Sequence, residues 1–294
     1  MSTIEKIMSR ASAMDDDKGS TGTEGQDVVF SSDTASEGGA RSEASPADST
    51  VDGRLFARIR EWARGHGMDV DTNGHQQIME EYRHIKRPLI SNIDGFGDKI
   101  KTHANRIMVT SAVPGEGKTF TAMNLAICLA AERGRSVILV DIDACRTPIP
   151  ELLGLSSDIG IIDFLDGAVD RLDDVLCDTD IPNLKYIPPG QTHHFFSELL
   201  CGAAMSKLFQ EIDAHFPNSI IVFDSPPLLA SSEAATLARV AGQIVMVVKS
   251  GFTRKQDLRE ATIMIDPKKV TGYVLNHVDR KHRSFASDSY MYSV

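Results

Sequence analysis

The sequence RIMVTSAVPGEGKT, residues 106–119, decides the fold. Its first half is a short run of mainly apolar residues, which predicts a buried strand over 106–112. Its second half, AVPGEGKT (112–119), is rich in small residues and leads into a helical pattern over 118–133. A strand, a glycine-rich turn ending in Gly-Lys-Thr and a helix make up a phosphate-binding P-loop, here with alanine in place of the first glycine.

In a loop of this kind, small residues let backbone N–H groups wrap a phosphate chain, and the start of the helix adds a positive end. We expect Lys118 to place its charge between the β- and γ-phosphates, and the Thr119 hydroxyl suits Mg²⁺. The residues expected to bind a nucleotide are Pro114, Gly115, Glu116, Gly117, Lys118, Thr119 and Phe120.

Two further apolar runs end in carboxylates. VILVDID (137–143) places Asp141 and Asp143 at the end of one expected strand, and IIVFDSPP (220–227) places Asp224 at the end of another. Open parallel sheets bind their ligands at this edge, and a carboxylate there is costly unless it is solvated, paired or facing a metal. One such residue could cap a turn. Three around one P-loop predict a phosphoryl-transfer site with Thr119, Asp141, Asp143 and Asp224 as metal ligands.

Short apolar runs alternate with longer amphipathic patterns from Arg106 onward. Strands are expected at 106–112, 136–143, 183–190, 219–224, 243–249 and 270–278, and helices at 118–133, 197–214, 232–241 and 254–265. Continuous apolarity indicates strands buried on both faces, and the repeated strand–helix–strand order gives a mostly parallel sheet. The predicted fold class is α/β of the P-loop NTPase type, with helices on both faces of the sheet.

Charge divides the chain at about residue 53. The net charge is −10, and residues 1–53 hold 11 acidic and 4 basic side chains. This segment is mostly Ser, Gly, Asp, Glu, Thr and Ala, so we expect a disordered acidic linker, with the pattern of one short helix over 2–14. Residues 54–294 carry 30 acidic and 27 basic side chains, and this near-neutral balance argues against a nucleic-acid partner.

Two helical patterns precede the first expected strand. RLFARIREWARG (54–65) spaces apolar residues among arginines, which favours packing on the protein's own domain over docking on a partner or an anionic membrane. A second helix is predicted over 76–86, ending before Pro88, because the residue ahead of a proline resists the helical conformation.

Nothing in the sequence suggests a membrane or secreted protein. No apolar run approaches the roughly 20 residues of a membrane-spanning helix, and the N-terminus lacks the apolar stretch of a secretory signal. The cysteines Cys128, Cys145, Cys177 and Cys201 fit no zinc or redox spacing, so we expect buried free thiols in a reducing cytosol.

Three motifs together resemble a known family. SAVPGEGKT (111–119), VILVDIDACRTP (137–148) and IVFDSPPLL (221–229), in this order, resemble the bacterial tyrosine kinases of capsule and exopolysaccharide assembly, over about residues 76–294. The resemblance implies that Lys118 and Thr119 hold the nucleotide and Mg²⁺, that Asp141 activates the acceptor hydroxyl, and that Asp143 and Asp224 complete the metal shell. LNHVDRK (275–281) resembles the family's stretch beside the adenine, which assigns Asn276 to the base.

The resemblance also implies assembly. The family carries an E-x-x-R-x-x-R oligomerisation motif, to which Glu80, Arg83 and Lys86 correspond, with lysine replacing the final arginine. Family members end in a tyrosine-rich tail that neighbouring subunits phosphorylate in trans; here a mobile tail from about residue 281 carries Tyr290 and Tyr292. EEYRHIKRPL (80–89) and MSTIEKIM (1–8) resemble the subgroup found beside exosortase systems.

The expected protein is thus an ATP- and Mg²⁺-dependent protein-tyrosine autokinase that governs exopolysaccharide or capsule synthesis and export. The resemblance implies a homo-oligomeric ring, protein tyrosine substrates and a separate membrane activator that holds a cytoplasmic kinase at the inner membrane. One alternative is a dimer-switch ATPase like ParA or MinD, although those proteins usually carry lysine at the P-loop position that Val113 occupies here. A non-catalytic, nucleotide-dependent scaffold of an export complex would share every motif.

Overall fold

The computed structural model describes residues 61, 74–96, 102–143, 148–155, 158–191 and 196–278. The expected acidic linker 1–53, the arginine-rich segment 54–65 apart from Glu61, and the tail from 281 lie outside the described residues. In the part described, no helix is both long and apolar enough to cross a membrane.

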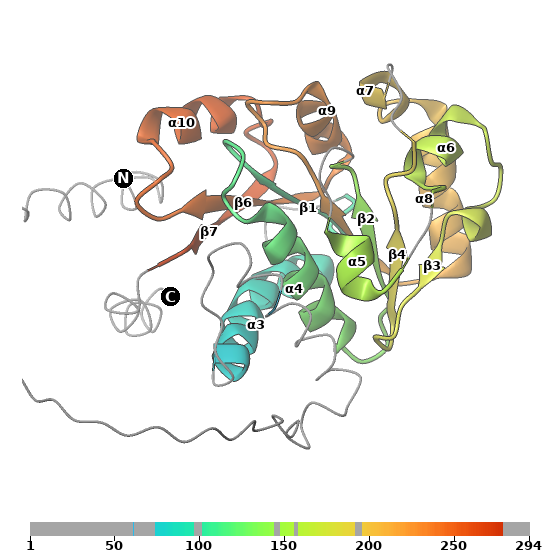
Figure 1. The fold of residues 1–294 in the computed structure, drawn as a ribbon, viewed down its shortest axis with the longest axis horizontal. Helices are drawn as coiled ribbons and strands as arrows, with labels where there is room; N and C mark the ends of the chain where they lie inside the picture. Colours follow the sequence, from blue (N-terminus) through green and yellow to red (C-terminus); the bar gives the residue numbers. More distant parts are fainter. Residues whose placement is uncertain are drawn as a thin grey trace, which may run out of the picture. The chain divides into compact units, whose positions relative to one another are not determined.

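Seven strands form one sheet in the order β3-β4-β2-β5-β1-β6-β7 (Figure 1). Their bounds are β1 Arg106–Ser111, β2 Val137–Asp141, β3 Cys177–Asp178, β4 Leu184–Ile187, β5 Ile220–Asp224, β6 Gln243–Lys249 and β7 Val270–Asn276. All neighbouring pairs are parallel except β3 with β4. The predicted α/β class with a mostly parallel sheet is confirmed, as are its six strands to within a few residues, whereas the two-residue β3 carries too little sequence pattern to be predicted.

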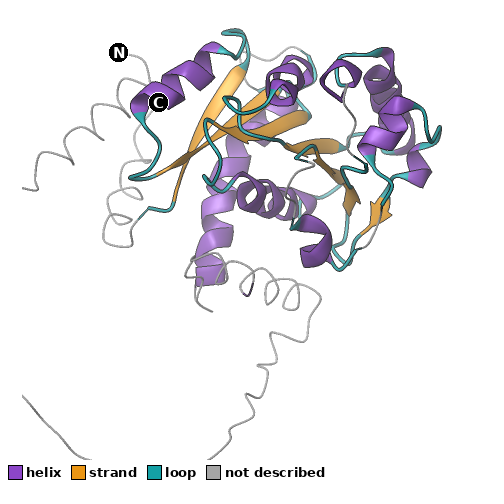
Figure 2. Cartoon of the chain, turned by 45° about the horizontal axis from the view of Figure 1, so that its top comes forward, coloured by secondary structure: helices purple, strands orange, loops and turns teal. Residues whose placement is uncertain are grey.

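Helices cover both faces of the sheet (Figure 2). Alternate strand residues such as Val109, Leu139 and Val222 join one buried cluster with the side chains of α3, α4 and α5, while Phe223 on the opposite face meets Phe209 of α8. The helix bounds are α3 Gly74–Ile93, α4 Lys118–Ala130, α5 Ile149–Leu153, α6 Ile161–Asp166, α7 Phe196–Leu199, α8 Ala203–His215, α9 Ser232–Val240 and α10 Lys255–Ile263. Burial on both faces explains why the strands read as continuous apolar runs.

The prediction that a helix ends before Pro88 is wrong. α3 continues through Pro88 to Ile93, because its second half is held by tertiary contacts: Leu89 is buried, and Ile90 and Ile93 pack on the core. The Gln243 side chain donates a hydrogen bond to the Leu89 carbonyl, with 3.1 Å between Nε2 and O. Packing and this hydrogen bond outweigh the lost N–H of the proline.

The single helix expected over 197–214 is also wrong. The chain forms α7, turns at Leu200 to Gly202, and begins α8 at Ala203. Gly202 has extended backbone angles, φ −81° and ψ −179°, so the turn rotates α8 to bury Met205, Leu208 and Ile212. Short α5 and α6, which lie outside the strong helical patterns, were not anticipated.

The cysteines match their prediction in part. Cys128 is buried, whereas Cys201 is exposed, and none of the described cysteines forms a disulfide. Cys145 lies outside the described residues.

Candidate active site

The P-loop connects β1 to α4 at the carboxyl edge of the sheet. Gly115 and Gly117 adopt left-handed backbone conformations, with φ of +83° and +94°, and Lys118 begins the helix. Glycine is the residue that takes such φ values without strain, which explains both glycines in the motif. The sequence-predicted strand–loop–helix unit is therefore present, with its N-terminal helix end directed at the edge where the acidic strand ends gather.

Glu116 supports the loop from inside. Its side chain is fully buried, and Oε2 accepts a hydrogen bond of 2.8 Å from the Val113 N–H, while Oε1 accepts one from the Thr253 hydroxyl. The Glu116 carboxylate thus closes the loop on itself and joins it to the segment after β6. We expected Glu116 among the nucleotide contacts, and its side chain is instead committed to the protein; its backbone N–H is the group left for a ligand. Phe120 is likewise buried in the core by its side chain.

Asn276, at the end of β7, contacts the back of the P-loop. Its Nδ2 donates a 3.0 Å hydrogen bond to the Glu116 carbonyl, and its Oδ1 accepts one of 2.9 Å from the His277 N–H. The predicted contact between Asn276 and adenine stays a prediction. What the geometry adds is that this amide also fixes the distance between β7 and the phosphate loop.

Gly117→Ala should disrupt this contact. A Cβ at position 117 would lie 2.1 Å from Asn276 Nδ2, and the left-handed φ adds a strain of about 1–2 kcal/mol. We expect affinity for a non-hydrolysable ATP analogue, measured by calorimetry, to fall by at least about tenfold, which is about 1.4 kcal/mol, because the collision with Asn276 displaces the phosphate-binding loop. Gly134→Ala is the matched control, since Gly134 has φ +74° with open space around it: it should lower the melting temperature and leave nucleotide affinity unchanged. Equal affinities in wild type and Gly117→Ala would refute this reading of the loop.

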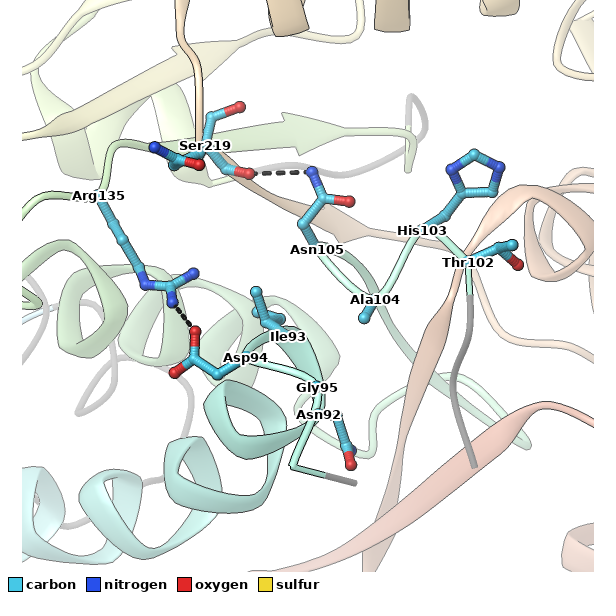
Figure 3. A pocket seen from close by; sticks show the side chains of 11 residues that line it. Asn92, Ile93, Asp94, Gly95, Thr102, His103, Ala104, Asn105, Arg135 and Ser219 are labelled. Carbon is cyan, nitrogen blue, oxygen red and sulfur yellow. Dashed lines mark hydrogen bonds and ion pairs between the residues drawn. The ribbon is translucent and has the colours of Figure 1, made fainter. Parts of the chain in front are cut away.

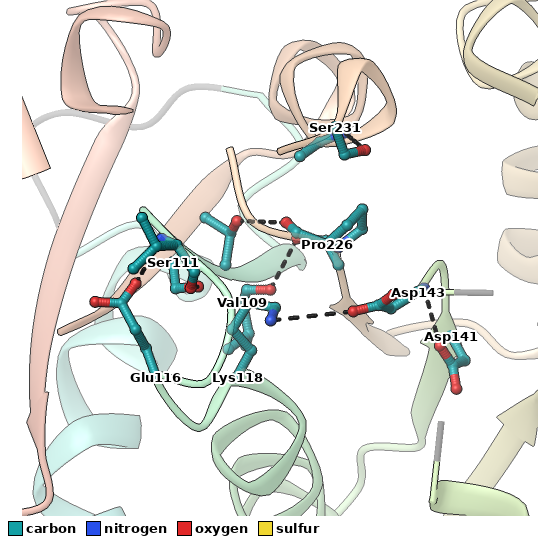
Figure 4. Close-up of polar contacts among 12 residues, drawn as sticks. Val109, Ser111, Glu116, Lys118, Asp141, Asp143, Pro226 and Ser231 are labelled. Carbon is teal, nitrogen blue, oxygen red and sulfur yellow. Dashed lines mark hydrogen bonds and ion pairs between the residues drawn. The ribbon is translucent and has the colours of Figure 1, made fainter. Parts of the chain in front are cut away.

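Two carboxylates lie side by side beyond the loop. Asp141 and Asp224 are register partners on the neighbouring strands β2 and β5, and both are fully buried. The Asp143 N–H donates to Asp141 Oδ1 at 3.0 Å, and Lys118 Nζ lies 4.0 Å from Asp143 Oδ2 (Figure 4). The fold therefore brings all four predicted catalytic residues to one edge of the sheet.

Asp224 lies in an electrostatically unfavourable environment for a charged carboxylate. Burial raises the pKa of its carboxyl well above the ordinary value, the Asp141 charge raises the pKa further, and the Thr119 hydroxyl and the Lys118 charge act in the opposite direction. No residue that the structure describes gives either oxygen of Asp224 a hydrogen bond of ordinary geometry. A buried carboxylate with two such oxygens is a group that a cation would stabilise.

These residues fit a magnesium ion beside a nucleotide. Mg²⁺ prefers oxygen ligands and usually keeps several waters and phosphate oxygens, so it needs one or two protein carboxylates and not a full cage. Among the described residues, no cluster of three or more acidic, histidine or cysteine side chains is arranged to hold a metal. Asp224 offers unsatisfied oxygens, and Asp143 and Thr119 lie within the same edge, half-exposed beside the loop.

The segment after Asp224 is clamped to the P-loop strand. Ser225 Oγ donates to the Val109 carbonyl at 2.9 Å, the Leu228 N–H donates to the Ser111 carbonyl at 2.9 Å, and Thr110 Oγ1 donates to the Pro226 carbonyl at 2.9 Å. These bonds explain the SPPLL sequence after Asp224: prolines carry no N–H to satisfy, and the Ser225 hydroxyl, the Pro226 carbonyl and the Leu228 N–H are paired. Asp224 consequently has a fixed position relative to Lys118.

Sequence reasoning missed two residues of this edge. Tyr186 of β4 donates a hydrogen bond from its hydroxyl to Asp141 Oδ2 at 3.1 Å, and Thr253 contacts Glu116. The sequence signal for Tyr186 is a phenol in a short strand, because a phenol that becomes buried needs a polar partner. Thr253 precedes α10, which begins after Arg254, and its hydroxyl donates a hydrogen bond to the Glu116 side chain in the P-loop.

The predicted oligomerisation residues do not share one environment. Glu80 and Arg83 form an exposed ion pair on α3. Lys86 is instead tied to α4 within the chain, where Nζ donates to the Cys128 carbonyl at 3.1 Å and pairs with Glu132. Only Glu80 and Arg83 therefore present their charges to solvent. Tyr290 and Tyr292 lie outside the described residues.

A cavity lies away from the P-loop, at the amino ends of β1 and β5. It measures about 470 Å³, and Asp94, Asn105, Arg135 and Ser219 are among its lining residues (Figure 3). Arg135 pairs with Asp94, and Asn105 Nδ2 donates to the Ser219 carbonyl at 3.0 Å. The Ser219 hydroxyl is buried without a hydrogen-bond partner among the described residues, and the cavity is separate from the P-loop edge.

Comparison with known proteins agrees with this geometry. Residues 107–292 match the CobQ/CobB/MinD/ParA nucleotide-binding domain. The tyrosine-protein kinase CpsD of Streptococcus pneumoniae is 31% identical over 203 residues, which cover 68% of this chain and 85% of CpsD. The chain belongs to the bacterial tyrosine kinases. Another relative in this family, the tyrosine-protein kinase YwqD of Bacillus subtilis, is 31% identical over 67% of this chain and 80% of its own length.

A solved structure supports the same family. The kinase domain of the Escherichia coli tyrosine kinase ETK superposes with a TM-score of 0.60 at 25% identity, covering 76% of this chain and 83% of that domain. Two further relatives, AmsA of Erwinia amylovora and EpsB of Ralstonia nicotianae, are much longer, and the matched part of this chain spans 24% and 23% of their lengths. The matches favour the kinase reading over the ParA- or MinD-like switch. The resemblance to an exosortase-associated subgroup stays a prediction.

Proposed function

We propose that this chain is an ATP- and Mg²⁺-dependent protein-tyrosine kinase that phosphorylates copies of itself and so regulates capsule or exopolysaccharide synthesis and export. The observation that carries the proposal is the convergence of Lys118, Asp141, Asp143 and Asp224 beside a P-loop. Membership of the bacterial tyrosine kinases narrows the reaction from nucleotide hydrolysis in general to transfer onto tyrosine.

The nucleotide side of the reaction follows from charge. Lys118 and the loop N–H groups would bind and neutralise the phosphates, and Thr119, Asp143 and Asp224 would hold Mg²⁺. When bound, Mg²⁺ would neutralise negative charge on the phosphate oxygens during transfer of the γ-phosphoryl group. Because the site is buried between β2, β5 and α4, these charges act in a medium of low polarity, where each is worth more than in water.

Asp141 would act on the acceptor. The incoming tyrosine oxygen bonds to the γ-phosphorus as the bond to the β–γ bridging oxygen breaks, ADP leaves, and the phenolic proton passes to a carboxylate. Asp141 suits this role because hydrogen bonds from Asp143 N–H and Tyr186 hold both its oxygens in place. Positioning of this kind supplies much of the rate of phosphoryl transfer.

Assembly and location are part of the proposal. We infer a homo-oligomer, with the exposed Glu80–Arg83 pair at its interface and one subunit's tail in the next subunit's site. A separate membrane protein of the polysaccharide chain-length or export type would activate the kinase and hold it at the inner membrane. Other protein tyrosines would be further substrates, and nucleic acid would not.

Replacing both Tyr290 and Tyr292 with phenylalanine should remove most phosphotyrosine from the chain while ATP binding persists. The reason is that an acceptor tyrosine must reach the buried carboxylates beside the P-loop. We expect Tyr290 and Tyr292 to do so from the tail. Phosphopeptide mass spectrometry after incubation with ATP and Mg²⁺ measures the result. Tyr273→Phe, a change at a half-buried tyrosine of β7, is the control and should leave the signal intact. Unchanged phosphotyrosine in the double variant would remove the tail from the mechanism.

A further inference from the structure

The two neighbouring carboxylates of the site are held very differently. Both oxygens of Asp141 accept hydrogen bonds from the chain, one from the Asp143 N–H and one from the Tyr186 hydroxyl. Neither oxygen of Asp224 accepts a hydrogen bond of ordinary geometry from a described residue. Because the two side chains are register partners on adjacent strands, their different environments must come from the neighbours of each strand.

Tyr186 is the neighbour that makes the difference on the β2 side. β4 runs parallel to β2, and Tyr186 is the register partner of Leu139. Asp141 follows Leu139 by two residues and so projects from the same face of the sheet, toward α4. The Tyr186 ring lies in the core cluster beneath α4, and its hydroxyl reaches to the carboxyl edge, 3.1 Å from Asp141 Oδ2.

The hydroxyl is placed where it has an electrostatic effect. Tyr186 and Asp141 are both fully buried, and a hydrogen bond to a carboxylate in such surroundings is stronger than one between neutral groups. This hydrogen bond also offsets part of the electrostatic repulsion between the Asp141 and Asp224 carboxylates. The ring alone would fill the core equally well as phenylalanine, so the packing does not account for the hydroxyl.

We propose that Tyr186 is a positioning residue, whose hydroxyl fixes the Asp141 carboxylate in the orientation from which it meets the acceptor tyrosine. The inference rests on the proposed function. Under this proposal Tyr186 ties Asp141 to β4 and holds it in one orientation, while the oxygens of Asp224, which lack a hydrogen bond of ordinary geometry from a described residue, remain available to a cation.

Tyr186→Phe tests the proposal, with Tyr82→Phe as the matched control. Tyr82 on α3 is the other buried tyrosine among the described residues, so its variant reports the general effect of deleting a buried phenolic hydroxyl. For Tyr186→Phe we expect kcat for phosphoryl transfer to fall about tenfold, within the range typical of residues that orient a reacting group, with KM for ATP unchanged within about twofold. Tyr82→Phe should keep wild-type kcat and KM.

Crystal structures of the nucleotide-free wild type and Tyr186→Phe give a readout that does not depend on activity. The proposal expects the Asp141 carboxylate to turn away from its wild-type orientation in the variant. It is overturned if Asp141 keeps that orientation, if kcat is unchanged, or if Tyr82→Phe loses as much kcat. If the wild type hydrolyses ATP without making phosphotyrosine, the kinase assignment is wrong, but the role of Tyr186 can still be tested. In that case the Asp141 orientation and the kcat for ATP hydrolysis are compared between wild type and Tyr186→Phe.

Discussion

Lys118→Met should abolish phosphoryl transfer and leave the fold intact. The lysine side chain is almost completely buried and its Nζ lies 4.0 Å from Asp143 Oδ2, so its charge lies among three carboxylates and the expected phosphates. Methionine keeps the unbranched apolar stem and removes the charge. Losing one preorganised group that stabilises developing charge typically lowers kcat by about 10²–10³-fold, and here the same group also neutralises the ground-state phosphates.

The measurement for Lys118→Met is phosphotyrosine formation beside circular dichroism and thermal unfolding. Lys185→Met is a suitable control, because Lys185 forms an ion pair with Asp178 away from the P-loop, and we expect it to keep wild-type activity. A folded Lys118→Met protein that forms phosphotyrosine at the wild-type rate would contradict the proposed mechanism.

Asp224→Asn should inactivate the protein while stabilising it. The pKa of Asp224 is raised in the folded state by burial and by Asp141, so the ionised form at neutral pH works against folding. Asparagine removes that charge from the site. We expect phosphoryl transfer to fall by at least about 100-fold, since the group that fits the cation is lost, and the nucleotide-free variant to melt at a higher temperature than wild type.

The pH dependence of this stabilisation has a definite sign. A carboxyl whose folded-state pKa is raised binds its proton more tightly in the folded state, so its contribution to stability improves as pH falls from the folded pKa toward the unfolded value of about 3.9. The advantage of Asp224→Asn should therefore be largest at about pH 8 and shrink at about pH 5. Thermal unfolding without nucleotide measures it, with the exposed Asp158→Asn as control. An Asp224→Asn protein that melts below wild type at the higher pH would show that Asp224 is not the buried, uncompensated charge described above.

The sheet and the acidic edge could be predicted because both follow from local sequence. A strand buried on both faces is a continuous apolar run, and carboxyl ends of parallel strands meet at one edge, so Asp141 and Asp224 could be placed near Lys118 without knowing any contact. The comparisons confirm the family resemblance, whose motifs include the strand ends and loops at this edge.

What could not be predicted depends on contacts between distant segments. The continuation of α3 past Pro88 depends on core packing and on Gln243, more than 150 residues away. The side chain of Glu116 faces inward because Thr253 and the Val113 N–H satisfy it, and Lys86 faces α4 because Glu132 and the Cys128 carbonyl are there. Tyr186 contacts Asp141 only because β4 lies beside β2. Local patterns carry no information on any of these pairings.

Incubation of the purified full chain with radiolabelled ATP and Mg²⁺ is the most direct test of the kinase proposal. Phosphotyrosine would be read with and without the cytosolic segment of a polysaccharide chain-length protein from the same organism. The proposal predicts label on tyrosine, mapped to Tyr290 or Tyr292, and none with Lys118→Met. Release of labelled phosphate with no phosphotyrosine, even with the membrane protein's segment present, would contradict it and indicate a nucleotide-driven switch.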